Sequence, residues 1–211
     1  MHNEAAARLL IAAPLSLERL AVRAARRPVD VVRTGMGPRR SEQALPRLTA
    51  APARALAVMG FCGALDGTLS PGELVVASEL RDPEGSVIAC PGAEALVDEL
   101  VRAGLRARIG VIASARRLVV GDARGRLAAA GAIAVDMESA WLAPAAAGRP
   151  FAVVRVVVDT PDREVHRPLA TVSGVLRASA VLRRAVRPLE AWARMGDGQP
   201  VASACASTRS M

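Results

Sequence analysis

The sequence contains no lysine and no tyrosine, and aromatic residues make up only 2% of it. So few aromatic side chains exclude the stacking platform that single-strand nucleic-acid-binding proteins use. All 28 basic residues are arginine, and the net charge of +8 would by itself favour a nucleic-acid or anionic membrane partner. Arginine in place of lysine, with abundant alanine, is also what a GC-rich genome produces without selection for function. We therefore expect no nucleic-acid partner and keep peripheral membrane contact open.

Cysteine and histidine are scarce as well. The three cysteines, Cys62, Cys90 and Cys205, are odd in number and unevenly spaced, which argues against both a disulfide framework and a zinc pattern. Only two histidines, His2 and His166, are present. We therefore expect no metal and no cofactor.

Long hydrophobic runs are also missing. The longest, Phe151–Val158, is interrupted by Arg155 and is too short to span a bilayer. The first residues lack the basic and apolar regions of a signal peptide, so we expect a cytoplasmic protein. With 211 residues and 52% hydrophobic content, we expect one domain over residues 1–195 and a disordered tail over 196–211, which is small and polar.

Short apolar runs and amphipathic segments alternate along the chain. The predicted strands lie near residues 8–14, 30–34, 55–59, 74–78, 108–114, 133–136 and 151–158, with a hairpin edge within 81–92. The predicted helices lie near residues 17–27, 39–50, 93–103, 126–130, 139–148 and 169–193. We expect Ser16 to cap the first helix, Pro144 to kink the fifth, and the last helix to be an amphipathic cover. This alternation predicts a three-layer α/β/α sandwich with a central, mostly parallel sheet.

Two apolar runs between Ile133 and Asp162 end in acidic residues. The first leads into Asp136 and Glu138, and the second into Asp159. The carboxyl ends of parallel strands open onto the crevice where ligands bind, so we expect these carboxylates to meet at one rim. Without metal ligands or a nucleophile elbow, they favour acid–base chemistry or stabilisation of positive charge, and glycosidic bond cleavage fits both.

Glycine-rich segments follow two other predicted strands. Residues 60–67 contain three glycines, which indicates a close approach to either another strand or a ligand. The segment has neither the GK[ST] ending of a P-loop nor the GxGxxG spacing of a dinucleotide fold. The turn Gly35–Gly37 either brings backbone amides to an anion or sugar or only reverses the chain.

Together these segments resemble the nucleoside phosphorylase and nucleosidase superfamily. GFCGALDGTLSPGELVVAS is similar to its glycine-rich strand exit, AVDMESA to its ribose-binding signature, VVRVVVDTPD to the strand ending in its catalytic Asp, and RTGMG to its glycine turn. The resemblance covers roughly residues 10–193 in order. It implies a nucleoside phosphorylase-like fold and an enzyme that cleaves the N-glycosidic bond of a purine nucleoside.

The resemblance also implies roles for individual residues. Glu138 would bind the ribose hydroxyls, Met137 would pack on the sugar, and Asp159 would protonate purine N7, which requires an environment that favours its protonated form. Glu18 would hold the attacking water, although the spacing there is loose by one residue. The other candidate substrate-binding residues are Gly35, Gly60, Phe61, Cys62, Gly63, Leu118 and Val119.

Several positions depart from the superfamily. Phe61 replaces a frequent Ser, and Leu118 stands where nucleosidases place an aromatic over the base, so the base pocket is altered. The phosphate-binding arginines of hexameric phosphorylases are replaced by Val58 and Ser16. Water is therefore the expected nucleophile, with phosphate kept open as a co-substrate through Arg33 of a neighbouring subunit.

Within the superfamily, the short chain, the APLSLERLAVRA opening and the RTGMG and VDMES pair are most similar to the hopanoid-associated phosphorylase branch. This similarity implies adenine release from adenosylhopane in hopanoid lipid biosynthesis. We also expect a homodimer, as in many members, while contact of the last helix with the inner membrane face stays open. Two alternatives stay open: a methylthioadenosine/S-adenosylhomocysteine or futalosine nucleosidase, and a catalytically silent nucleoside-binding protein.

Overall fold

The computed structural model describes residues 9–160 and 168–195 of the chain, and in the last helix it describes side chains from residue 174 onward. The predicted disordered tail 196–211 lies outside the described residues, as do Asp162, Cys205 and the two histidines.

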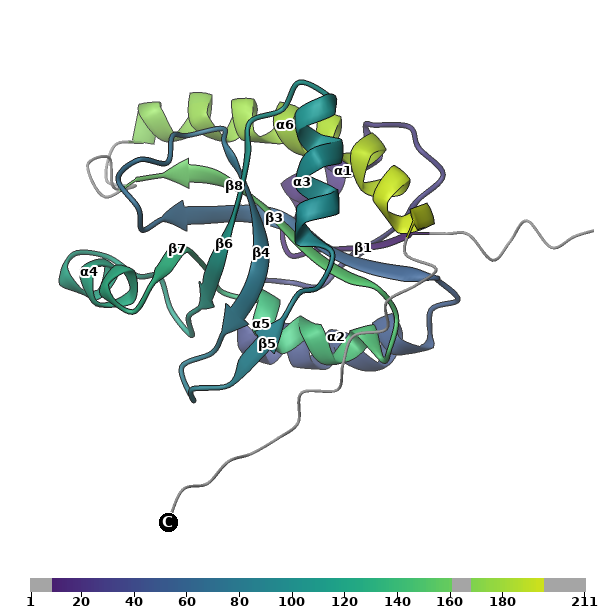
Figure 1. Ribbon diagram of the computed structural model, residues 1–211, viewed down its shortest axis with the longest axis horizontal. Coiled ribbons are helices and arrows are strands. Elements are labelled where there is room, and N and C mark those ends of the chain that lie inside the picture. The colour runs from purple at the N-terminus through teal and green to yellow at the C-terminus, as the bar shows by residue number, and fades with distance from the viewer. Residues whose placement is uncertain (1–8, 161–167, 196–211) are drawn as a thin grey trace, which may run out of the picture.

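Strands and helices alternate as predicted (Figure 1). The strands are β1 (Leu9–Ala13), β2 (Asp30–Arg33), β3 (Ala55–Ala64), β4 (Leu74–Arg81), β5 (Val87–Ala89), β6 (Ala107–Ser114), β7 (Ala132–Asp136) and β8 (Phe151–Asp159). The helices are α1 (Ser16–Arg23), α2 (Pro38–Ala50), α3 (Ala93–Arg102), α4 (Asp122–Ala129), α5 (Ser139–Leu142), the 3₁₀ helix η2 (Ala143–Ala146) and α6 (Pro168–Met195).

The strands form a single, mostly parallel sheet, which confirms the predicted fold class. Parallel pairs join β1 to β2, β1 to β3, β3 to β8, β4 to β6, and β6 to β7. Antiparallel pairs join β3 to β7, β4 to β5, and β4 to β8. As a result β3, β8, β4, β6 and β7 close into a ring, which the alternation of strands and helices does not predict.

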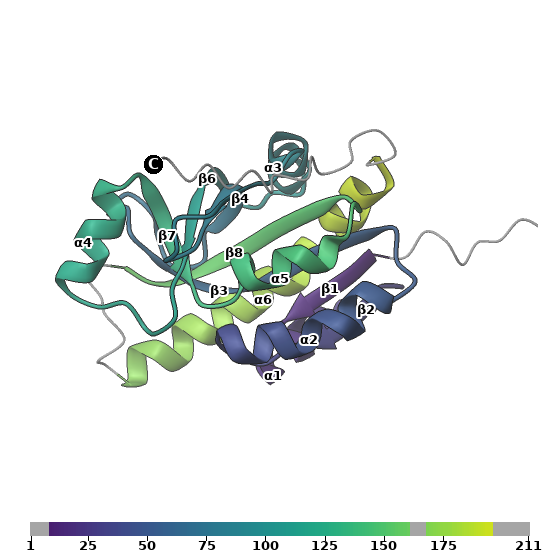
Figure 2. The ribbon, with the colours of Figure 1, turned by 90° about the horizontal axis from the view of Figure 1, so that it is seen from below.

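Helices cover both faces of the sheet. In Figures 1 and 2, α1, α3 and α6 lie on one face and α2 and α5 on the other, while α4 lies at one end beside β7. Leu9 and Ile11 of β1 pack in the core under α1, α3 and α6, whereas Leu10 and Ala12 pack in the core with α2 and α5. Burial on both faces explains why the strands read as unbroken apolar runs.

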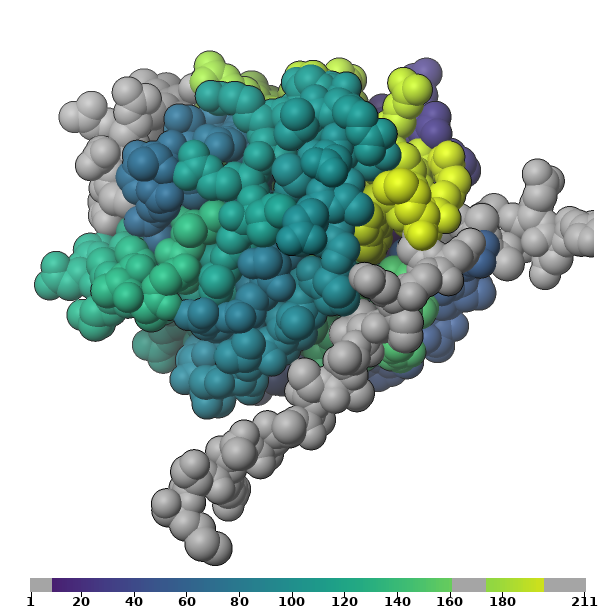
Figure 3. Space-filling view, in the orientation of Figure 1, coloured from purple at the N-terminus to yellow at the C-terminus, as the bar shows by residue number. Residues whose placement is uncertain are grey.

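The last helix is the amphipathic cover that was expected. Figure 3 shows the last turns of α6 packed beside α3. Its buried face carries Leu182, Val186, Leu189 and Trp192. Among the helices of residues 9–160 and 168–195, none is both long enough and apolar enough to cross a bilayer.

Two details of the helices differ from the predictions. Ser16 as the cap of α1 is wrong, because the cap is Leu15 and Ser16 is the first helical residue. The Glu18 side chain performs the capping, since its Oε2 accepts a hydrogen bond from the Leu15 backbone N at 2.6 Å. The helix predicted near 126–130 begins earlier, at Asp122.

Pro144 interrupts the helix predicted over 139–148, as expected. The α-helical part ends at Leu142, and Pro144 lies in the 3₁₀ helix that follows. Proline has no N–H to donate to the carbonyl of Ala140, so the α-helix cannot continue through it.

Candidate active site

Strand β3 has a gap in its pairing on one side. It continues to Ala64, past its predicted end, so Gly60 and Gly63 stand inside a strand and not in an exit loop. β1 pairs with residues 55–58 and β7 with Gly63 and Ala64; in the described chain no strand bonds to residues 59–62 on that side. Instead, the Phe61 backbone N donates to Glu18 Oε1 at 2.7 Å. A side chain here satisfies a backbone group that a neighbouring strand would otherwise bind.

A cluster of three carboxylates and one guanidinium surrounds this gap. The Arg155 side chain is fully buried, and its Nη2 lies 2.8 Å from Asp136 Oδ2 and 3.3 Å from Glu138 Oε2. Glu18 completes the cluster, because both it and Arg155 lie against Gly60. We call Glu18, Asp136, Glu138 and Arg155 the carboxylate cluster.

Asp136 is held by the turn after β7. Its Oδ1 accepts from Ser114 Oγ at 2.7 Å and from the backbone N of Glu138 at 3.2 Å. Ser139 donates to it through both its backbone N and its Oγ. With these bonds and the ion pair to Arg155, Asp136 fixes the turn that presents Glu138.

Glu138 is buried at the end of the same turn, and only 5% of it is exposed. Its Oε1 accepts from the Gly37 backbone N at 3.1 Å, so the glycine turn after β2 touches the carboxylate cluster. Burial raises the pKa of Glu138 to about 7, although Arg155 acts in the opposite direction. Near neutral pH the Glu138 carboxyl is therefore partly protonated and partly ionised.

The charges of the cluster constrain one another. Burial raises the pKa of Glu18, against the lowering effects of Arg155 and of the N–H groups of Leu15 and Phe61. Burial alone would lower the pKa of Arg155, but the surrounding carboxylates, Asp136 first, outweigh it and raise that pKa. The Arg155 guanidinium therefore stays positively charged, and it partly offsets the effect of burial on the pKa of Glu18 and of Glu138.

Two glycines of β3 make room for these side chains. A Cβ at Gly60 would lie 2.5 Å from Arg155 Nη1 and 2.6 Å from Glu18 Oε1. A Cβ at Gly63 would lie 2.8 Å from both Arg124 Nη2 and Asp159 Oδ1. Both glycines therefore permit the close approach of site side chains, whereas the sequence alone had indicated another strand or a ligand.

Asp159 lies at the end of β8, where Arg124 of α4 binds it. Arg124 is only 4% exposed, and its Nη2 donates to Asp159 Oδ2. Its Nε also donates to Val119 O at 3.1 Å, and its Nη1 to Ala64 O at 3.3 Å. A guanidinium in contact favours the ionised form of a carboxylate. Proton donation by Asp159, which the resemblance implies, stays a prediction.

A small cavity adjoins this ion pair. Its volume is about 40 Å³, and Gly63, Leu118, Val119, Met137 and Asp159 are among the residues that line it. That volume holds about one water molecule, whereas ligand pockets have volumes of roughly 300–1,000 Å³. Leu118 is 65% exposed at its mouth. A purine can bind here only if the lining side chains move apart.

Two predicted substrate-binding side chains face the core instead. The Phe61 side chain packs with the core under α6, so only its backbone meets the gap. Cys62 is 4% exposed, and burial raises the pKa of its thiol far above its ordinary value. Such a thiol is a poor nucleophile, and substrate binding by Phe61 and Cys62 stays a prediction.

The structure brings the remaining predicted residues to two neighbouring positions. Glu18, Glu138 and Gly60 meet around Arg155. Asp159, Gly63, Leu118, Val119 and Met137 line the small cavity, which Asp136 also lines. Gly35 lines a different cleft, on the far side of the turn that ends at Gly37.

Arg155 and Arg124 are the charged residues that sequence reasoning missed. The sequence contained a signal for Arg155, which interrupts an apolar run in a strand predicted to be buried. A buried charge requires partners, so this position indicated a charged site. Arg124 had none, since it lies in a segment with no apolar period. Among the described residues, no group of three or more His, Cys, Asp or Glu is arranged to hold a metal ion.

The chain matches one protein-family model and resembles many solved structures. A family model described as the phosphorylase superfamily matches residues 13–187. No curated protein matches the sequence. Many solved structures share the fold. One is the futalosine hydrolase of Helicobacter pylori, with 16% identity and a TM-score of 0.75 over 88% of this chain and 97% of that chain.

Two nucleosidases are similarly close. The 5′-methylthioadenosine/S-adenosyl homocysteine nucleosidase of Helicobacter pylori has 18% identity and a TM-score of 0.75 over 90% of this chain and 99% of that chain. The S-adenosylhomocysteine nucleosidase of Streptococcus pyogenes has 20% identity and a TM-score of 0.71 over 90% and 98%. At these identities the likeness shows a shared fold.

Proposed function

Because the chain belongs to the phosphorylase superfamily, and is thus an enzyme that acts on nucleosides, we propose that it hydrolyses the N-glycosidic bond of an adenosine-type nucleoside and releases adenine. The observation that carries the proposal is the buried carboxylate cluster beside a second, separate carboxylate–arginine pair. Departure of a purine builds positive charge on the sugar and negative charge on the base. The two groups suit these opposite charges.

In this reaction Glu138 binds the sugar. Its ionised carboxylate accepts hydrogen bonds from the ribose hydroxyls and stabilises the positive charge that develops near C1′. Asp136 and Gly37 hold it in place through the bonds described above. Met137 adjoins Glu138 in the chain and lines the small cavity, so it packs against the sugar on the side of the base.

Glu18 holds the water. A carboxyl whose pKa is raised by burial is a better base near neutral pH than an exposed one. The water oxygen forms a bond to C1′ and gives its proton to Glu18, while the electron pair of the C1′–N9 bond passes to the purine. The Phe61 N–H already donates to the Glu18 carboxylate and is not available to a phosphate. The negative charge of Glu18 would also repel phosphate, so the arrangement favours water as the nucleophile.

Asp159 and Arg124 act on the base. The resemblance assigns N7 protonation to Asp159, which gives its proton to the departing purine. Arg124, which contacts Asp159, places a positive charge beside the base and stabilises the negative charge of the leaving purine. Since the cavity holds about 40 Å³, purine binding requires Arg124 or Leu118 to move first.

The finer proposal for the substrate is adenosylhopane, with a homodimeric enzyme at the membrane face. Support comes from exposed apolar side chains near the start of α1 and the glycine turn, namely Leu17, Leu20 and Met36, which suit an apolar substrate or an apolar partner surface. The alternative substrates are methylthioadenosine, S-adenosylhomocysteine and futalosine. The fold that this chain shares with nucleosidases for these compounds supports them equally well.

The decisive experiment follows release of the free base from each of these nucleosides, with and without phosphate. We expect release that does not need phosphate. The Asp159→Asn variant should lose most turnover and keep nucleoside binding, whereas a silent binding protein has no turnover to lose. No base released from any of the nucleosides would refute the proposal, and release from the others alone would refute adenosylhopane. Light scattering of the purified protein tests the homodimer.

A further inference from the structure

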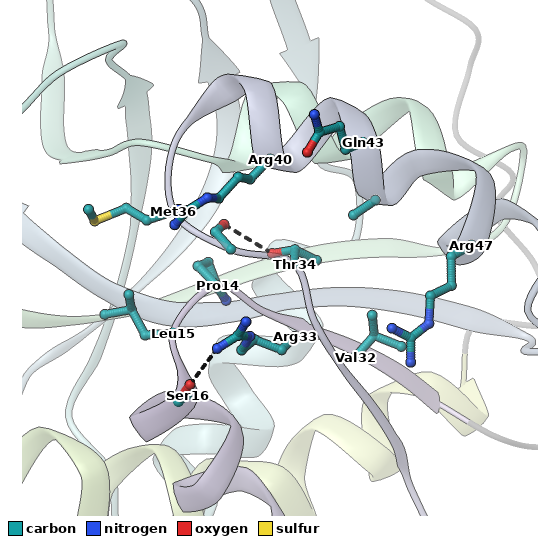
Figure 4. A pocket seen from close by; sticks show the side chains of 12 residues that line it. Pro14, Leu15, Ser16, Val32, Arg33, Thr34, Met36, Arg40, Gln43 and Arg47 are labelled. Carbon is teal, nitrogen blue, oxygen red and sulfur yellow. Dashed lines mark hydrogen bonds between the residues drawn. The ribbon is translucent and has the colours of Figure 1, made fainter.

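A second, larger cleft lies next to the candidate active site. Its volume is about 680 Å³, and it is lined by residues 14–16, by residues 32–36 and by one face of α2 (Figure 4). It is distinct from the carboxylate cluster, because none of the four residues of that cluster lines it. The proposed catalytic steps use none of its arginines.

The lining of the cleft is strongly basic. It includes Arg33, Arg40 and Arg47, and none of its lining residues is acidic. Figure 4 shows Arg33 on β2 and Arg47 reaching from α2 toward Val32, with Arg40 beside the glycine turn. Within the described part of the chain, no carboxylate forms an ion pair with any of these three guanidiniums, whereas Arg108, Arg116, Arg124 and Arg155 each pair with a carboxylate. Like charges gathered without a counterion favour an anionic ligand.

Two further features favour an anion. Ser16 Oγ accepts a hydrogen bond from Arg33 Nη1 at 2.8 Å, which orders one guanidinium at the rim. Ser16 is also the first residue of α1, so the positive end of that helix dipole faces the cleft. Thr34 and Gln43 add neutral polar side chains to the lining.

The size and position of the cleft narrow the choice of anion. A volume of about 680 Å³ is that of a whole ligand and much exceeds the needs of one inorganic ion. Gly35 and Met36 line the cleft, and the next residue, Gly37, binds Glu138. We propose that this cleft, the arginine cleft, binds a phosphate ester, with the phosphate on Arg33 and Arg47 and the organic part along the glycine turn.

The test measures binding to three probes by calorimetry: inorganic phosphate, adenosine 5′-monophosphate, and phosphatidylglycerol vesicles against phosphatidylcholine vesicles. We expect an ester probe to bind at least tenfold more tightly than inorganic phosphate. The double variant Arg33→Gln/Arg47→Gln should weaken that binding by tenfold or more, because each arginine contributes a charge-assisted hydrogen bond. Arg39→Gln is the matched control, since Arg39 is exposed on α2 outside the lining and should leave binding unchanged.

The three probes separate the sources of the ester. Binding of the nucleotide indicates a soluble phosphate ester, and binding of the anionic vesicles alone indicates a lipid headgroup; both outcomes support the cleft. Equal losses in Arg39→Gln and in the double variant would show nonspecific charge attraction and overturn the proposal, as would binding of none of the probes. These measurements need no turnover, so they stand apart from the proposed hydrolysis. Circular dichroism confirms that the variants, which change exposed side chains, remain folded.

Discussion

At the scale of single residues, one buried guanidinium determines the properties of the candidate site. Arg155 interrupts an otherwise apolar strand, and every carboxylate of the cluster is arranged around it. The sequence shows where the charge lies, since a charged residue within an apolar run stands out. It does not show the partners, because they come from other elements: Glu18 from α1, and Asp136 and Glu138 from the end of β7 and the turn after it.

Replacing Arg155 by Met should destabilise the fold strongly. Loss of one partner leaves buried carboxylates without compensation, which costs about 3–5 kcal/mol. The loss should shrink at pH 5, where the carboxyl groups accept protons. Urea denaturation at both pH values checks this, with Arg102→Met as a control. The Arg102 side chain, which pairs with Glu99, is 65% exposed, so its replacement should change stability by less than about 0.5 kcal/mol.

Glu138 should make stability depend on pH. Its pKa is raised from 4.5 to about 7, so between these values the folded protein keeps a proton that the unfolded chain has lost. The contribution of Glu138 to stability should therefore be greatest below about pH 4.5 and fall as pH rises to about 7, by on the order of 3 kcal/mol. Glu138→Gln should remove this part of the dependence. Denaturation midpoints of both proteins between pH 5 and 8 decide it, and parallel curves would contradict it.

The same titration should appear in catalysis. If ionised Glu138 binds the ribose, kcat/KM rises with pH up to about 7, because this parameter reports groups of the free enzyme. Glu138→Gln should be slower and should lose the rise. A profile with the same shape in both proteins would mean that another group, such as Glu18, controls the activity.

Gly60 should not tolerate a side chain. An added Cβ would overlap Arg155 Nη1 and Glu18 Oε1, so Gly60→Ala should cost about 1–3 kcal/mol and reduce activity. Gly67→Ala is the control, because a Cβ there meets nothing within 4 Å. Thermal melts and activity of the two variants should differ clearly, and similar behaviour would show that the cluster adapts easily.

At the scale of elements, periodicity predicted the existence and order of the helices and strands. It also predicted which face of the last helix is apolar, because burial follows a helical period. Boundaries were less predictable. The first helix is capped by Leu15 and Glu18 and not by Ser16. The Glu18 carboxylate is held by the Phe61 N–H of β3, and from there it accepts the hydrogen bond of the Leu15 N–H. The strand β3 continues through glycines that taken alone indicate a turn.

The buried face of α6 provides a test of this element. Leu182 is fully buried against the sheet, whereas Leu176 is 64% exposed on the same helix. Leu182→Ala should cost about 2–5 kcal/mol, and Leu176→Ala should cost little because the helix propensities of both residues are high. Chemical denaturation of the two variants checks the orientation of the helix. Equal costs would contradict it.

At the scale of the whole molecule, the fold class was predictable and the closure of the sheet was not. Parallel alternation predicts an open sheet in which β7 and β8 run the same way, so that their acidic ends meet at one rim. Instead β7 pairs antiparallel with the end of β3, while β8 runs parallel to it. Asp136 and Asp159 meet because Gly63 lies between Val135 and Asp159 in the ladder. Pairing of this kind depends on twist and curvature, which no local pattern records.

Closure of the ring also bears on the solubility of the chain. Strands with unpaired backbone groups are where proteins join into aggregates, and the ring leaves few such strands among residues 9–160. The outermost strands are β2, of four residues with Asp30 and Arg33 exposed, and β5, of three residues. Both are short, and β2 is charged. Although 52% of its residues are hydrophobic, the chain therefore exposes little strand edge on which a second chain could add a strand. Arg33 contributes to this protection as a charged residue of β2, and it also lines the arginine cleft.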